Sequence, residues 1–173
     1  MPSSADATTA SPENHAGAHE VVTPLMTLRT EVEPAFEWIV AMVAGTDVGS
    51  LARERVRSAL MDGHWQGNLD KAARLADKLV DNAVNHGAAF PDGTITLRLM
   101  VDAKTRELLV EVQDAFRDFP GFVDIANQSG SVAGRPKGLW WVAYYKGRLS
   151  WGLKKNADGE VVGKKVQVIL PIV

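Results

Sequence analysis

A helix predicted over about residues 68–86 carries the side chains best suited to chemistry. At about 100° per residue, Lys78, Asn82, Asn85 and His86 fall on one arc of this helix, among leucines. An asparagine carbonyl is a good oxygen ligand for Mg²⁺, which usually also binds substrate phosphates. The arc therefore indicates a phosphate-bearing ligand. The plainer alternative is that the asparagines close the last turn and the histidine complements the helix dipole.

A single carboxylate, Asp114, ends an alternating strand predicted over 107–113. At the end of a strand, one carboxylate can accept a hydrogen bond from an exocyclic amine such as that of adenine. Aspartate is also common in strand-end turns for purely local reasons. Asp114 is thus a candidate ligand contact whose weight depends on what lies near it.

A glycine-rich run leads directly into a short predicted helix. Free N–H groups and the positive end of a helix dipole can meet phosphate there, assisted by Arg135 or Lys137. The run is not a Walker A sequence, and such a helix start can equally be a simple turn. The residues of the run are Gly134, Arg135, Pro136, Lys137, Gly138 and Leu139.

Composition limits the class of protein. The chain has 173 residues, 46% hydrophobic and 23% charged, which suits one globular domain with an adequate core. A net charge of −2 gives no indication of binding to nucleic acid or to a membrane surface. The absence of cysteine excludes disulfides, thiolate zinc sites and a cysteine nucleophile. With no signal-like leader and no apolar stretch near the ~20 residues that span a bilayer, we expect a cytoplasmic protein.

The first part of the chain differs from the rest. Residues 1–20 are small and polar, so that ordering them would cost more entropy than burial could offset, and we predict a disordered tail. His15 and His19 stand at helical spacing but have no further ligand nearby, which favours solvated residues over a metal site. A single domain is predicted over 21–173.

Periodicity predicts an α+β fold for that domain. The order is strand, two helices, hairpin, long loop, short helix and hairpin, which predicts a two-layer α/β sandwich with a mixed, mostly antiparallel sheet and helices on one face. Asp47 is the expected N-cap of the first helix, and Gly87 suits the C′ position of the second. The loop, about 115–137, is long enough to be a lid or binding loop. The other segments are 36–44, 48–61, 68–86, 94–101, 107–113, 138–146, 148–154 and 164–170.

The order of these features resembles the GHKL (Bergerat-fold) ATPase superfamily, and within it the bacterial anti-sigma-factor serine/threonine kinases. Their N box has the form Glu-Leu-Val-Thr-Asn-Ala-Val-x-His-Gly, and the two glycine boxes follow at positions matching Asp114 and the run from Gly134 to Leu139. The resemblance covers roughly the last three-quarters of the chain. The matching segment here reads Lys78-Leu79-Val80-Asp81-Asn82-Ala83-Val84-Asn85-His86-Gly87.

The resemblance implies a Bergerat-type ATP-binding domain with ATP and Mg²⁺ as cofactors. Asn82 would hold Mg²⁺ against the phosphates, Asp114 would bind the adenine amine, and Gly134, Gly138 and Leu139 would form the lid hinge and phosphate contact. Such proteins sequester a sigma factor and phosphorylate a serine or threonine of an antagonist protein. The implied partners are therefore a sigma factor or its antagonist, with no direct contact to nucleic acid or membrane, and a homodimer is possible. The full set of implied cofactor contacts is Asn82, Asn85, His86, Asp114, Gly134, Arg135, Lys137, Gly138 and Leu139.

Lys78 departs from this pattern at the position where the family has its glutamate general base. A protonated lysine cannot accept the proton of an attacking hydroxyl. Asp77 and Asp81 are adjacent in sequence, but they project ~140° and ~100° away from Asn82 around the helix. Three hypotheses remain: a kinase, a nucleotide-binding regulator without catalysis, and a domain whose pocket is empty.

Other departures lie in the loop and the last hairpin. Phe116 stands where many members have glycine, and the interval between Gly134 and Gly138 is wider than Gly-x-Gly. Lys165, two residues after Gly163, replaces a threonine of the family. Four aromatic residues of the short helix are expected to pack in the core. If two of them were exposed, they would mark a protein interface instead. These are Trp140, Trp141, Tyr144 and Tyr145.

Overall fold

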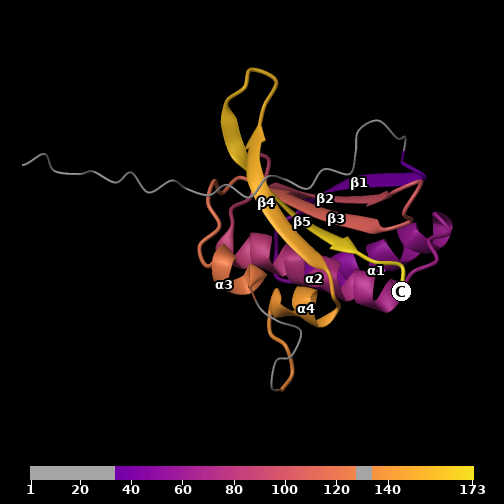
Figure 1. Cartoon of the computed structure of the whole chain (residues 1–173). Coiled ribbons are helices and arrows are strands. Elements are labelled where there is room, and N and C mark those ends of the chain that lie inside the picture. Colours follow the sequence, from indigo (N-terminus) through magenta and orange to yellow (C-terminus); the bar gives the residue numbers. More distant parts are fainter. Residues whose placement is uncertain (1–33, 128–133) are drawn as a thin grey trace, which may run out of the picture.

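The computed structural model describes residues 34–127 and 134–173, which form two layers (Figure 1). One layer is a five-stranded sheet in the order β1-β2-β3-β5-β4, and every pair of neighbours is antiparallel. The predicted α+β sandwich with a mostly antiparallel sheet is confirmed, and the described sheet is antiparallel throughout. The strands are β1 (Phe36–Val43), β2 (Thr94–Val101), β3 (Leu108–Asp114), β4 (Arg148–Lys155) and β5 (Val161–Leu170).

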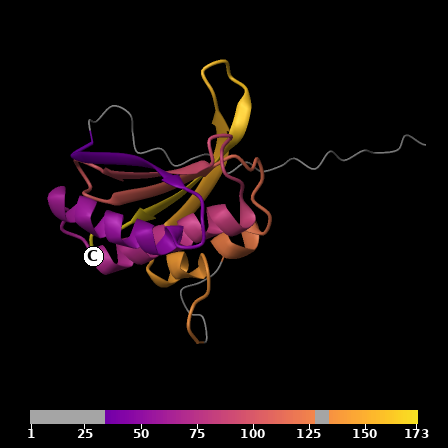
Figure 2. The ribbon, with the colours of Figure 1, turned by 180° about the vertical axis from the view of Figure 1, so that it is seen from behind.

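The second layer consists of helices that cover one face of the sheet, as the view from behind also shows (Figure 2). Helix α2 lies against the middle of the sheet because small and branched apolar residues recur along one side of it, from Ala72 to Ala83, and all are buried. They pack with the inward residues of the central strands into one core. The helices are α1 (Val48–Asp62), α2 (Leu69–His86), α3 (Phe122–Ala126) and α4 (Trp140–Tyr144).

The ends of α1 and α2 only partly follow the predicted capping. Asn68 caps α2, since its side chain accepts a hydrogen bond from the Lys71 N–H at 3.0 Å. Asp47 precedes α1 but makes no side-chain capping bond. Gly87 is extended, with φ −101° and ψ −152°, and is not the left-handed residue expected at C′. A different requirement therefore holds glycine at position 87, and it lies in the site.

The segment that follows β3 is not the structureless lid that its composition predicts. It contains α3, and the rings of Phe119 and Phe122 are buried against Trp151 of β4. Ring centroids are 5.4 Å apart for the two phenylalanines and 6.0 Å apart for Phe119 and Trp151. Edge-to-face and tilted aromatic contacts of this kind anchor the segment to the sheet. The predicted lid also includes 128–133, which lie outside the described residues.

The predicted tail over 1–20, with its two histidines, and the segment 21–33 also lie outside the described residues. Within the part that is described, no helix is long and apolar enough to cross a membrane.

Candidate functional site

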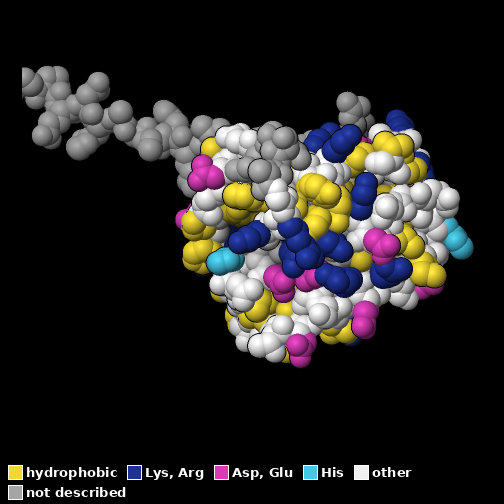
Figure 3. Space-filling view, turned by 90° about the horizontal axis from the view of Figure 1, so that it is seen from below, with side chains coloured by type: hydrophobic (Ala, Val, Ile, Leu, Met, Phe, Trp, Pro, Cys, Tyr) yellow, Lys and Arg dark blue, Asp and Glu magenta, His cyan; other side chains and the backbone are white. Residues whose placement is uncertain are grey.

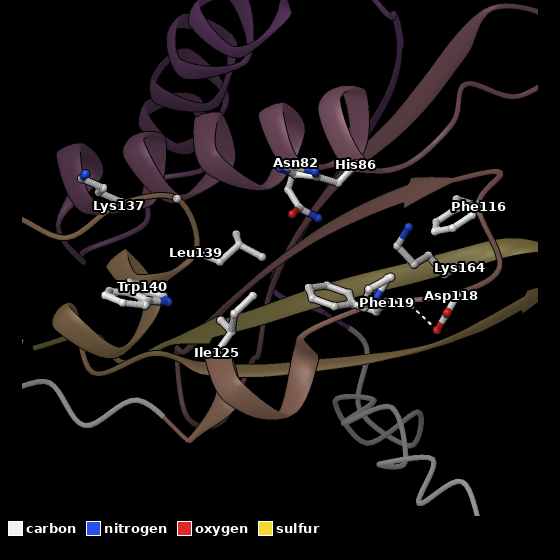
Figure 4. A pocket seen from close by; sticks show the side chains of 12 residues that line it. Asn82, His86, Phe116, Asp118, Phe119, Ile125, Lys137, Leu139, Trp140 and Lys164 are labelled. Atoms are coloured by element: carbon white, nitrogen blue, oxygen red, sulfur yellow. Dashed lines mark hydrogen bonds between the residues drawn. The ribbon is translucent and has the colours of Figure 1, made fainter.

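A cavity of about 590 Å³ opens between α2, α3 and the residues that lead into α4. Figure 4 shows the side chains that line it, with the amide of Asn82 extending from α2 into the space and Lys164 reaching in from β5. The lining combines aromatic and aliphatic groups with a few polar ones, as expected of a small-molecule site. It is formed by Asn82, His86, Phe116, Asp118, Phe119, Pro120, Ile125, Lys137, Gly138, Leu139, Trp140 and Lys164.

The two ends of this cavity differ in character (Figure 4). One end holds the ring of Phe116 beside Lys164, whose Nζ lies 5.0 Å from the ring centroid. The other end holds Lys137 and Trp140, next to the backbone of Gly138. A flat apolar group is suited to the first end, and an anionic group can meet a solvent-exposed cation at the second.

A smaller cavity of about 280 Å³ adjoins the first and shares the same stretch of α2. All four polar residues of the predicted helical arc line it, so the arc is a real feature of the surface. The shared wall explains why Asn82 and His86 contact both spaces. The lining consists of Lys78, Asp81, Asn82, Asn85, His86, Gly138 and Leu139.

Three of the predicted ligand residues do not line either cavity: Asp114, Gly134 and Arg135. The guanidinium of Arg135 lies 6.0 Å from the ring centroid of Trp141, which gives it a packing role at the outside of α4. Gly134 is exposed. The glycine-rich run thus contributes Lys137, Gly138 and Leu139 to the site, and its first half faces elsewhere.

Asp114 differs most from its predicted role. Its side chain is fully buried, and its Oδ1 accepts hydrogen bonds from Lys164 Nζ at 2.9 Å and from the Phe116 N–H at 2.8 Å. Oδ2 is also buried and has no hydrogen-bond partner among the described residues. Lys164 is only 2% exposed and is itself one of the residues that line the cavity, whereas Asp114 is not. Lys164 thus already occupies Asp114 Oδ1, and the contact of Asp114 with an adenine amine stays a prediction.

Glycine is required on both sides of this ion pair. A Cβ atom on Gly87 would lie 2.5 Å from the Ala83 carbonyl oxygen and 2.7 Å from Cγ and Oδ1 of Asp114, closer than real Cβ atoms approach other atoms. A Cβ atom on Gly163 would overlap the carbonyl oxygen of Asp114 and come within 2.9 Å of the Ala115 Cα. The close approach of Gly87 to the end of α2 and to Asp114, rather than a left-handed turn, explains the glycine at position 87.

Sequence reasoning singled out Lys165 and missed Lys164. Strand register contains the signal that was overlooked: Lys164 pairs with Asp114, two residues before Val166, which pairs with Val112 on the same face of the sheet. That face is turned toward the helices and is apolar. A lysine on the same face as buried valines needs a partner of opposite charge. The neighbouring strand β3 ends in such a residue, Asp114.

Lys78 is held in ion pairs on α2. Its Nζ lies 3.7 Å from Oδ2 of Asp81 and 4.0 Å from Oδ2 of Asp77, and Asp77 is also paired with Arg53 of α1. The angular estimate placed both aspartates away from Asn82. Asp81 nevertheless lines the smaller cavity together with Asn82, because the two residues are adjacent in sequence and the cavity extends along the surface of the helix.

Burial raises the pKa of the Asp81 carboxyl above its usual value of 3.8, and the neighbouring Asp77 carboxylate raises it further, while Lys78 opposes the shift. A raised carboxyl pKa means that the folded state holds the proton more tightly than the unfolded chain does. Asp81 therefore lowers the stability of the fold progressively as the pH rises from 3.8 through the raised pKa.

We expect Asp81→Asn to raise the melting temperature at neutral pH, because the neutral amide does not have to be ionised in a partly buried place. The difference from wild type should shrink as the pH falls through and below 3.8, since the carboxyl is then protonated in both states. Melting temperatures measured across this range check the prediction. Asp158→Asn, in the exposed turn between β4 and β5, is the control. A gap that did not change with pH would contradict it.

The aromatic residues of α4 divide into two pairs. Trp141 is buried as predicted for the core, and Tyr145 is half-buried beside it. Trp140 is 37% exposed and Tyr144 is 50% exposed, so this pair meets the condition stated for an interface. Seen from the side of the helices, Lys and Arg side chains gather on this surface together with Asp and Glu (Figure 3).

The described residues contain no group of three or more histidine, aspartate or glutamate side chains able to hold a metal ion.

No model of a known protein family matches the chain, and no curated protein matches it. Among solved structures, a mycobacterial sensor histidine kinase, MprB, is similar at 19% identity with a TM-score of 0.44, over 79% of this chain and 97% of that one. This similarity is too low to assign the chain to a family. Its function is therefore inferred from the cavity and its lining.

Proposed function

We propose that this protein is a regulatory domain of the Bergerat type that binds a nucleoside triphosphate with Mg²⁺ and acts on a partner protein by contact, without transferring phosphate. The observation that supports this most directly is the cavity of about 590 Å³, in which Asn82 lies between an aromatic end and a cationic end. A nucleotide matches this arrangement, because it has a flat aromatic base at one end and anionic phosphates at the other.

The residues present fit such a ligand. The volume falls inside the range of about 300–1,000 Å³ usual for small-molecule sites. Phe116 and Phe119 offer aromatic surface for a base, and Lys137 and Lys78 offer cations near the place for phosphates. Mg²⁺ needs few protein ligands when it also binds phosphates and water, so the single amide oxygen of Asn82 suffices. ATP is the nucleotide that the resemblance to the anti-sigma-factor kinases names.

The absence of phosphoryl transfer in this proposal rests on Lys78. Its ammonium is engaged by the carboxylates of Asp81 and Asp77, at 3.7 and 4.0 Å. A charged ammonium can attract phosphate oxygens but cannot take a proton from an attacking hydroxyl. With a cation at this place, the binding function is supported and the transfer step is not.

The surface proposed to contact a partner protein is α4. Exposed aromatic residues are enriched at protein interfaces, and Trp140 both lines the nucleotide cavity and is partly exposed. A ligand in the cavity would therefore contact a residue that a partner also contacts. The resemblance supplies the class of partner, which is a sigma factor or its antagonist protein.

One observation favours the kinase as a second candidate. The Asp81 carboxyl lines the small cavity with Asn82, and its pKa is raised by burial, which brings a carboxylate closer to the value suited to a general base near neutral pH. Asp81 is nevertheless paired with Lys78 at 3.7 Å, so its oxygen is not free to accept a substrate proton.

Binding is tested by thermal unfolding with and without Mg-nucleotide. At a concentration about 100 times the dissociation constant, we expect the melting temperature of the wild type to rise by about 5 °C or more, since the ligand binds only the folded state. Asn82→Ala should lose most of that rise, because the Mg²⁺ ligand is removed. Purine triphosphates should be compared individually at millimolar concentration.

Asn68→Ala is the matched control, since it is the same substitution on the same helix. Loss of the α2 cap should lower the melting temperature itself but leave the ligand-induced rise unchanged. If none of the purine triphosphates shifts the melting temperature of the wild type, the proposal of nucleotide binding is wrong, and a domain that works through its partner surface alone is left.

A further inference from the structure

We propose that Lys164 sets which purine the cavity accepts, and that it favours a purine with a keto group at position 6, such as hypoxanthine or guanine, over the 6-amino purine adenine. This inference rests on the proposed nucleotide binding and names the base that the site takes.

The Lys164 ammonium is held in place by two contacts. Its Nζ donates to Asp114 Oδ1 at 2.9 Å and lies 5.0 Å from the Phe116 ring centroid, and the residue is 2% exposed. Two contacts therefore fix the ammonium at the aromatic end of the cavity, where the base would lie. An ammonium has three hydrogens and no lone pair, so that it can only donate. The remaining donor capacity is available to a ligand.

The carboxylate of Asp114 lies behind this ammonium. Asp114 Oδ1 already accepts from Lys164 and from the Phe116 N–H, and Asp114 does not line the cavity. The hydrogen bond that an exocyclic amine would give to this carboxylate is thus given by the chain itself. An adenine amine placed at this end would meet another donor, and two opposed donors lose their hydrogen bonds to water without replacement.

Lys164 and Asp114 together are neutral, so the pair does not demand an anion from the ligand. A neutral carbonyl oxygen is enough to accept a hydrogen bond from the ammonium, and the 6-keto purines carry one where adenine carries its amine.

The experiment compares ITP with ATP as Mg²⁺ complexes by calorimetric titration of the full chain. The two nucleotides share ribose and phosphates and differ only at the purine edge, so that their ratio isolates the base. A charge-assisted hydrogen bond gained against a donor conflict should make ITP bind about tenfold more tightly or better, with GTP following ITP. Equal affinities, or a preference for ATP, would overturn the inference while leaving nucleotide binding intact. Failure of every nucleotide to bind would instead refute the proposed function.

Variants then assign the preference to Lys164. Lys164→Thr removes the donor and frees the Asp114 carboxylate, so the ratio should reverse in favour of ATP. Lys165→Thr is the matched control, because the neighbouring side chain lies on the other face of β5 and should leave the ratio unchanged.

If the unpaired carboxylate prevents Lys164→Thr from folding, the double variant Lys164→Met, Asp114→Asn removes both charges together. Its folding is checked by circular dichroism. Its ITP to ATP affinity ratio should fall toward one, and a ratio that stayed as in wild type would show that Lys164 does not read the base.

Discussion

Asp114→Ala is expected to lower the free energy of unfolding by about 3–5 kcal/mol, the usual cost of removing one partner of a buried ion pair. Lys164 is 2% exposed and would be left in an apolar place without its carboxylate partner at 2.9 Å. The Phe116 N–H would also lose its acceptor at the start of the loop that walls the cavity. Denaturation in urea without any nucleotide measures the loss. A residue whose only role was to contact a ligand would show almost none under these conditions.

The double variant Asp114→Ala, Lys164→Met separates the missing charge from the missing side chain. Because both charges are removed together, it should recover most of the lost stability, and the two single changes should be strongly non-additive. A single-variant loss below about 1 kcal/mol, in the range of exposed pairs, would mean that solvent reaches the pair.

The fold followed from patterns that are local in sequence. The alternation in β2 and the apolar stripe of α2 each have a period that only one secondary structure satisfies, and both elements lie where they were predicted. The segment after β3 was misread because its aromatic anchors, Phe119 and Phe122, pack on Trp151 of a later strand. A local sequence pattern cannot predict a contact between residues so far apart in the chain.

The same distinction divides the site. The polar arc of α2 was predictable because four positions on one helix determine one another's directions, and all four line the small cavity. The ion pair of Asp114 with Lys164 joins residues 50 positions apart and depends on the register of β3 with β5. Without that register, Asp114 reads as a free strand-end carboxylate and Lys164 as an ordinary strand residue. The pairing engages Asp114 Oδ1 inside the protein, behind the lysine that lines the cavity.

The rate of nucleotide hydrolysis should depend strongly on the residue at position 78. The wild type should hydrolyse bound nucleotide no faster than solution background, since Lys78 cannot act as a base. Lys78→Glu places a carboxylate in the small cavity with Asn82, and general-base assistance contributes on the order of 10²–10⁴ in rate. We therefore expect this variant to raise hydrolysis by about 10²-fold or more. Release of phosphate under single-turnover conditions, at saturating Mg-nucleotide, measures it.

Lys78→Gln is the control, because it removes the cation and its ion pairs with Asp81 and Asp77 without supplying a base. It should stay at background, which would show that the gain needs a proton acceptor and does not come merely from releasing the aspartates. Robust turnover by the wild type would reverse the reasoning. In that case Asp81→Asn would decide between the two candidate functions. Abolished turnover would make Asp81 the general base, as the second candidate function requires. Lys78 would then orient that carboxylate from 3.7 Å.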